Sequence, residues 1–278
     1  MNAILEFFGL LNIDGKEPFF VRVPEGPWSW QHIVFVSVLM VLIIFLAVYL
    51  GRANRNKTPE EKNKVLIWTA FLIDGFEIVK IIVLCIRYQN PMQWIYVLPL
   101  FLCSIQLIAI PMAAFCKGRI REACLDFVLT FGILGGTFGT VGATQIYAKT
   151  PVIAMDSVFS AITHSLSAFA SIYIAVVGLI SMKKKNFPIT MGILLGFAAM
   201  AYIANMATGY NYMFLKYHDG TPYSIFYNLV GGSPVLYPMI VVGIFVVYLC
   251  AFYAIYHAIL KRRAKAATPA EAEETATV

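Results

Sequence analysis

QHIVFVSVLMVLIIFLAVYLG, residues Gln31–Gly51, decides the fold class, because the stretch is 21 residues long and holds no Asp, Glu, Lys or Arg. About 20 apolar residues in a helix cross the ~30 Å hydrocarbon core of a bilayer. Similar runs recur along the 278 residues, of which 60% are hydrophobic and 13% are charged. Soluble domains carry about 25% charged residues. The composition therefore excludes a soluble enzyme, a disordered chain and a secreted disulfide scaffold.

The apolar runs predict an all-α fold, a polytopic transmembrane bundle of seven helices in one membrane domain, residues 31–261. The predicted spans are 31–51, 65–86, 92–115, 121–145, 156–182, 187–210 and 233–261. Residues 1–30 are predicted to form an extracytoplasmic segment with a short interfacial helix. Residues 262–278 are predicted to form a disordered cytoplasmic tail, because most of them are small, polar or acidic.

The positions of Lys and Arg predict the orientation. Most of these residues fall in alternate connections, namely 52–64, 117–121, 183–185 and 261–265, and the other connections hold few. Because cytoplasmic loops are the ones enriched in Lys and Arg, the N-terminus is predicted outside and the C-terminus in the cytoplasm. The same placement argues against nucleic acid as a partner, although the net charge is +6.

The second predicted span contains ionisable side chains. Asp74, Glu77 and Lys80 fall within a 120° sector of a helix and so share one face. Ionisable groups in hydrocarbon are costly and normally point into the bundle or a wet cavity. Two interpretations stay open: a structural ion pair between Glu77 and Lys80, or a substrate or proton site.

The fifth predicted span carries a polar stripe. Ser160, His164, Ser167 and Ser171 follow helical spacing on one face, which favours a polar cavity over an isolated hydrogen-bonded histidine. The fourth span holds a run of glycines with GxxxG spacing, FGILGGTFGTVGA, which favours close helix packing over a hinge or a cavity.

The third predicted span brackets Cys103 and Gln106 with Pro99 and Pro111, which free backbone carbonyls and bend a helix. Counted from the outer span ends, the depths of Cys103 and His164 differ by about 4–5 Å, so the two could meet if their helices are neighbours. Such a pair would join a nucleophile to a base. The alternative is a cysteine that packs as a small inert hydrophobe.

No cofactor or metal site is predicted. Histidines at the span ends and in a loop show no HxxxH, HExxH or CxxC spacing. A retinal protein is excluded, because the last span has no lysine before Lys261.

Several strings resemble the YwaF family of bacterial integral membrane proteins, in consistent order from about residue 30 to residue 260. The matching strings are LPLFLCS (Leu98–Ser104), the histidine of ITHSL, ATGYNYMFLKY (Ala207–Tyr217) and GGSPVLYP (Gly231–Pro238), together with Glu77 in the acidic second span. The chain departs from the family's third-span motif at Phe101, where histidine is common. The resemblance implies a multi-pass protein of the cell (plasma) membrane.

That family is similar to a eukaryotic multi-span acyltransferase that remodels phospholipids. The resemblance implies that Cys103 is the nucleophile and His164 the general base, with membrane phospholipids as substrates. It also suggests supporting roles. Glu77 would orient His164, while other polar side chains would support the site or bind the head group: Asp74, Lys80, Gln106, Ser160, Asn205, Asn211 and Tyr212.

An alternative from another class is a transporter or small-molecule receptor. Its polar pathway would use Asp74, Glu77 and Lys80 with the Ser160/His164 stripe. A third alternative is a structural or assembly protein, for which a dry, closed bundle is expected.

Overall fold

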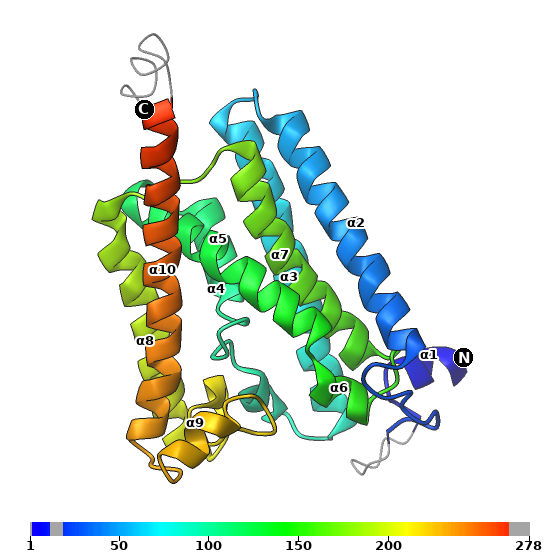
Figure 1. Ribbon diagram of the computed structural model, residues 1–278. Coiled ribbons are helices and arrows are strands. Elements are labelled where there is room, and N and C mark those ends of the chain that lie inside the picture. Colours follow the sequence, from blue (N-terminus) through cyan, green and yellow to red (C-terminus); the bar gives the residue numbers. More distant parts are fainter. Residues whose placement is uncertain (1, 12–18, 267–278) are drawn as a thin grey trace.

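The computed structural model describes residues 2–11 and 19–266, and this part of the chain contains helices and no strand (Figure 1). In chain order the helices are α1 (Asn2–Phe7), α2 (Trp30–Asn54), α3 (Pro59–Arg87), η1 (Gln93–Val97), α4 (Gln106–Phe115), α5 (Gly118–Val141), α6 (Thr144–Lys149), α7 (Met155–Val177), η2 (Lys184–Asn186), α8 (Phe187–Thr208), η3 (Tyr212–Phe214), α9 (Ser224–Leu229) and α10 (Leu236–Ala266). The predicted all-α class is confirmed for these residues.

Among the described residues, five helical segments are long and apolar enough to cross a membrane. They are Trp30–Asn54, Gly118–Lys149, Met155–Val177, Lys184–Thr208 and Leu236–Lys265. Helix α3 is also long, with 29 residues, but it carries the three ionisable side chains noted above. It packs against α4 and α7 along the bundle (Figure 1).

The prediction of a continuous third helix over 92–115 is wrong. The chain there forms η1, an irregular segment (residues 98–105) and the ten-residue helix α4. Pro99 explains the interruption, since its ring disfavours helical backbone at the preceding residue, and Leu98 is extended at φ −54° and ψ 146°. Seven continuous spanning helices are therefore not what the structure shows.

The N-terminal helix agrees with the sequence prediction, whereas the predicted start of the C-terminal tail does not. Helix α1 lies where a short interfacial helix was predicted. Residues 262–266, however, continue α10 as regular helix instead of starting a disordered tail. Residues 267–278, the remainder of the predicted tail, lie outside the described residues.

The basic connections lie together at one end of the bundle, here called the basic end. The Arg119 side chain donates to the Lys185 carbonyl, and Lys183 pairs with Glu122 at 2.7 Å. The α2–α3 turn and the end of α10 lie at the same end, whereas α1, α6 and α9 lie at the opposite end (Figure 1). This grouping is what the orientation argument requires, and the side of the membrane that each end faces stays a prediction.

Helix α7 lies at the centre of the bundle and packs against α2, α3 and α5. Small residues allow the contact with α5 to be close. A Cβ added at Gly132 would come within 2.7 Å of the Ser167 carbonyl oxygen, and one added at Gly136 within 2.6 Å of Ala168 Cβ. The interpretation of the glycine run as a close packing face is confirmed. Helices α8 and α10 stand to one side of this group (Figure 1).

A buried ion pair at the α1 end joins α3 to α7. Arg87, 2% exposed, donates to both carboxylate oxygens of Asp156 at 2.9–3.0 Å and to the Phe8 carbonyl at 2.6 Å. Because the pair connects the last turn of α3 to the first turn of α7, it sets the register of the two helices.

Candidate functional site

Helix α3 contributes a charged pair to the interior. Lys80 Nζ lies 2.6 Å from Glu77 Oε2, and the two side chains are 17% and 12% exposed. They are three positions apart in the chain, so they share the face of α3 that meets α7. The predicted ion pair is therefore present.

Helix α7 positions the imidazole of His164. Its Nδ1 lies 2.7 Å from the carbonyl oxygen of Ser160 and 3.4 Å from the Ser160 hydroxyl. A carbonyl oxygen only accepts hydrogen bonds, so Nδ1 is the protonated nitrogen and Nε2 is left with its lone pair. The group that orients His164 is thus the Ser160 carbonyl, while the Glu77 carboxylate is engaged with Lys80.

Cys103 comes from the irregular segment 98–105, three residues before α4 begins. The glycines of α5 lie beneath both reactive side chains. A Cβ at Gly135 would come within 3.2 Å of Cys103 Cβ, and one at Gly139 would overlap the ring of His164. Because these glycines lack side chains, the thiol and the imidazole can approach from different elements.

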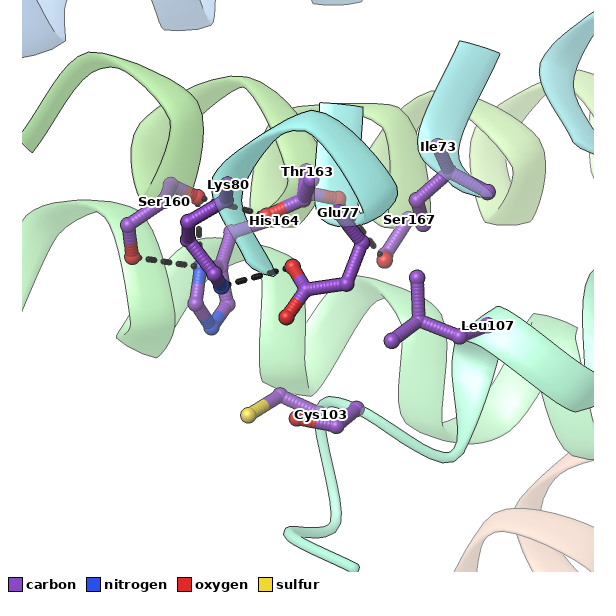
Figure 2. Close-up of a pocket in the computed structure, with 10 residues that line it drawn as sticks. Ile73, Glu77, Lys80, Cys103, Leu107, Ser160, Thr163, His164 and Ser167 are labelled. Atoms are coloured by element: carbon purple, nitrogen blue, oxygen red, sulfur yellow. Dashed lines mark hydrogen bonds and ion pairs between the residues drawn. The ribbon is translucent and has the colours of Figure 1, made fainter. Parts of the chain in front are cut away.

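Cys103 and His164 come from different elements and line the same space. They share a cavity of about 40 Å³ at the junction of α3, α4 and α7. Figure 2 shows the imidazole and the thiol directed into the same space, with the Glu77–Lys80 pair beside it. The lining residues are Ile73, Glu77, Lys80, Cys103, Ser104, Leu107, Ser160, Thr163, His164 and Ser167. Since one water molecule needs about 10–15 Å³, the cavity has room for a few water molecules.

Two other predicted site residues lie near the cavity without lining it. Asp74 is one turn away from Glu77 on α3 and partly exposed, outside the lining set. Gln106, in the first turn of α4, is fully buried, and its amide oxygen and nitrogen have no hydrogen-bond partner among the described residues.

Asn205 lies in the last turn of α8, and Asn211 and Tyr212 lie in the connection that follows; the two amides hold the backbone of this connection. The Asn205 amide pairs with both backbone groups of Tyr212, at 2.5 and 2.9 Å. The Asn211 amide bonds the backbone of Lys216 and Tyr217. The Tyr212 hydroxyl donates to the Ile95 carbonyl. These polar groups are thus engaged in shaping the connection and in fixing it to η1.

Phe101, at the position where the family motif commonly has histidine, belongs to this aromatic region. Its ring contacts Tyr210, Tyr212 and Phe214 at centroid distances of 5.5–6.4 Å. The residue therefore packs against the connection after α8 and does not line the cavity.

Sequence reasoning missed several contributors. Thr163 and Ser104 line the cavity, and Gly135 and Gly139 lie against Cys103 and His164. The glycine run was visible in the sequence, but the contact of Gly139 with His164 depends on which helices are neighbours, and no signal in the sequence shows that. In the described part of the chain, no group of three or more His, Cys, Asp or Glu side chains could hold a metal ion.

Comparison with known proteins gives a family. The TMEM164 family matches residues 27–260, which is most of the chain and covers every element from α2 to α10. No curated protein and no solved structure matches the chain. The relation to the YwaF family stays a prediction. With its apolar helices and this match, the chain belongs to the TMEM164 family of membrane proteins.

Proposed function

We propose that the protein is a membrane-embedded acyltransferase that acts on glycerophospholipids through Cys103 and His164. The observation that carries the proposal is the meeting of these two side chains in one cavity, although about 60 residues separate them in the chain. A cysteine beside an imidazole whose Nε2 is free is the arrangement that activates a thiol nucleophile.

The surroundings of Cys103 support this role. The residue comes three positions before the N-terminus of α4, where the helix dipole gives a partial positive charge. That charge favours a thiolate and the oxyanion that forms when a carbonyl is attacked. The cavity is small, so it would admit the ester group while the acyl chains stay in the bilayer.

The reaction would have two steps. In the first, His164 Nε2 takes the thiol proton, Cys103 Sγ attacks the ester carbonyl, and the ester C–O bond breaks. The imidazolium returns the proton to the leaving lysophospholipid hydroxyl, and a thioester remains. In the second, an acceptor hydroxyl gives its proton to Nε2 and attacks the thioester. The C–S bond breaks, and the thiol is protonated again.

Trapping the thioester tests the proposal. Purified protein in vesicles would be incubated with phospholipid labelled in the acyl chain, then treated with neutral hydroxylamine. We expect release of label from the wild type and none from Cys103→Ala. His164→Gln should slow labelling by about 10²-fold or more. Cys116→Ala, at the other end of α4, is the matched control and should label normally. Equal labelling of the wild type and Cys103→Ala would overturn the proposal.

We place the protein in the cell membrane with its basic end in the cytoplasm and the cavity toward the outer half. The gathering of the basic connections at one end supports this orientation. Reporter fusions test it: a phosphatase that folds only outside the cytoplasm should be inactive after residue 266 and active in front of α2.

A further inference from the structure

Lys80 is the cationic group of the cavity, and most of its hydrogen-bonding capacity is unused. An ammonium carries three donors. Among the described residues, the structure gives Nζ one partner, Glu77 Oε2 at 2.6 Å. The side chain is only 17% exposed, so the remaining donors face the cavity that contains Cys103 and His164.

Two of the hydroxyl groups that line the cavity already donate to the backbone of α7. Thr163 Oγ1 donates to the Ser160 carbonyl at 3.1 Å, and Ser167 Oγ donates to the Thr163 carbonyl at 3.0 Å. His164 donates through Nδ1 to the Ser160 carbonyl. An anionic oxygen that enters the cavity therefore finds its charged donor at Lys80.

The buried ion pair between α3 and α7 fixes the height of Lys80. Lys80 lies seven residues from Arg87 on α3, and His164 lies eight residues from Asp156 on α7. At 1.5 Å per residue these are about 10 and 12 Å from the ion pair. Lys80 is thus level with the reacting groups and slightly nearer the α1 end, and its long side chain can reach toward the interface.

In a glycerophospholipid, the phosphate lies on the polar side of the acyl esters. A group that binds the phosphate while the ester meets Cys103 must therefore lie at the height of the thiol or nearer the interface. Lys80 is at that height. A lysine acts on phosphate as a compact point charge and needs no planar geometry.

We propose that Lys80 binds the phosphate of the lipid substrate, with Glu77 keeping the ammonium in place and the empty site neutral. This proposal rests on the proposed function, because it names the substrate group that the acyl-transfer cavity recognises. It also separates the two members of the ion pair, since only Lys80 attracts the phosphate and Glu77 repels it.

Equilibrium binding tests the proposal in a Cys103→Ala background, which lacks the nucleophile of the proposed acyl transfer. The probes are lysophosphatidylcholine and the monoacylglycerol with the same chain, which lacks the phosphate. Lys80→Gln should weaken binding of lysophosphatidylcholine by about tenfold or more and leave the monoacylglycerol unchanged. Lys80→Arg should retain the preference for the phosphate. Glu77→Gln should not weaken it, because the substitution removes a repelling charge.

Lys183→Gln is the matched control, since Lys183 forms an ion pair of similar length at the basic end, away from the cavity. Equal loss in Lys80→Gln and Glu77→Gln would mark a purely structural ion pair and overturn the proposal. Equal weakening of both lipids by Lys80→Gln, or no weakening, would overturn it as well.

The acyl-transfer proposal can fail separately. A phosphate preference that depends on Lys80, in a protein that forms no thioester, would support the role of Lys80 and count against the acyltransferase. A thioester with no such preference would overturn the role of Lys80 alone.

Discussion

The α5–α7 pair and the α8–α10 pair are built in opposite ways. Of the most apolar stretch of each helix, 61% is buried in α5 and 67% in α7, against 22% in both α8 and α10. Glycines of α5 meet the backbone of α7, whereas α8 and α10 enclose an apolar groove of about 570 Å³. The candidate site lies on the closely packed side.

In this comparison the helices with the highest mean hydropathy are less buried than α5 and α7. The two most apolar segments, in α2 and α10, have mean hydropathy 3.2 and 2.4 and are 11% and 22% buried, while α5 and α7 have 1.6 and 1.5. Lipid is as apolar as leucine, so apolar character does not draw a helix inward. Small residues favour a buried position because they let helix backbones approach closely. Polar residues favour it because they need protein partners in the absence of water.

Removing the charge at Arg87 should produce the largest loss of stability. Arg87→Met would leave the Asp156 carboxylate unpaired between α3 and α7, which costs about 3–5 kcal/mol when a buried pair is broken. Lys183→Met breaks an exposed pair and should cost less than about 1 kcal/mol. Unfolding free energies in detergent would measure both. Similar small losses of unfolding free energy in both variants would mean that the Arg87–Asp156 pair does not stabilise the contact between α3 and α7.

Alanine at Gly136 should destabilise the protein by about 1–3 kcal/mol, because the new Cβ meets the His164 carbonyl oxygen at 2.7 Å and neither backbone can move freely. Gly196→Ala in α8 is the matched control, since a Cβ there meets nothing within 4 Å. The control should leave stability unchanged or raise it. Thermal unfolding of the two variants would decide, and losses of equal size would contradict the contrast between the helix pairs.

Alanine at Gly139 should affect the chemistry more than the fold. Its Cβ would overlap the ring of His164, which can swing away from Cys103 without shifting the backbone. We expect thioester formation to slow by about tenfold or more at nearly constant stability. Gly192→Ala, in open space on α8, should react normally. Unchanged labelling of Gly139→Ala would show that the observed ring position is not needed.

The smallest effect is expected at Gly243, which lines the groove on α10 and where an added Cβ would meet nothing within 4 Å. Gly243→Ala should stabilise the protein by about 0.5–1 kcal/mol through helix propensity alone. Denaturation midpoints would measure this gain. A loss of stability instead would indicate that α8 and α10 pack directly against each other in the membrane.

Much of the fold could be predicted from the sequence because span length and charge placement are local properties. The apolar run that begins at Gln31 lies in α2, and the run that includes Leu236 lies in α10. The basic connections lie at one end of the bundle. The interruption before Cys103 was harder, since proline is often tolerated in a membrane helix and indeed lies inside α4 at Pro111.

The site was only partly predictable. The polar stripe on α7 and the depth of Cys103 suggested that Cys103 and His164 could lie near each other, and both residues line the same cavity. The ion pair of Arg87 with Asp156 and the position of Gly139 beneath His164 depend on which helices are neighbours, and a single sequence carries no such information.

The interrupted segment before α4 has a consequence for how the protein is made. Ten helical residues span about 15 Å, half of the hydrocarbon core, so this part of the chain cannot rest in lipid as an independent helix. Its irregular backbone needs protein around it. Its partner α3 is synthesised before it, but its other main partner, α5, leaves the ribosome later. Residues 98–115 are therefore fully covered by protein only after α5 has been synthesised.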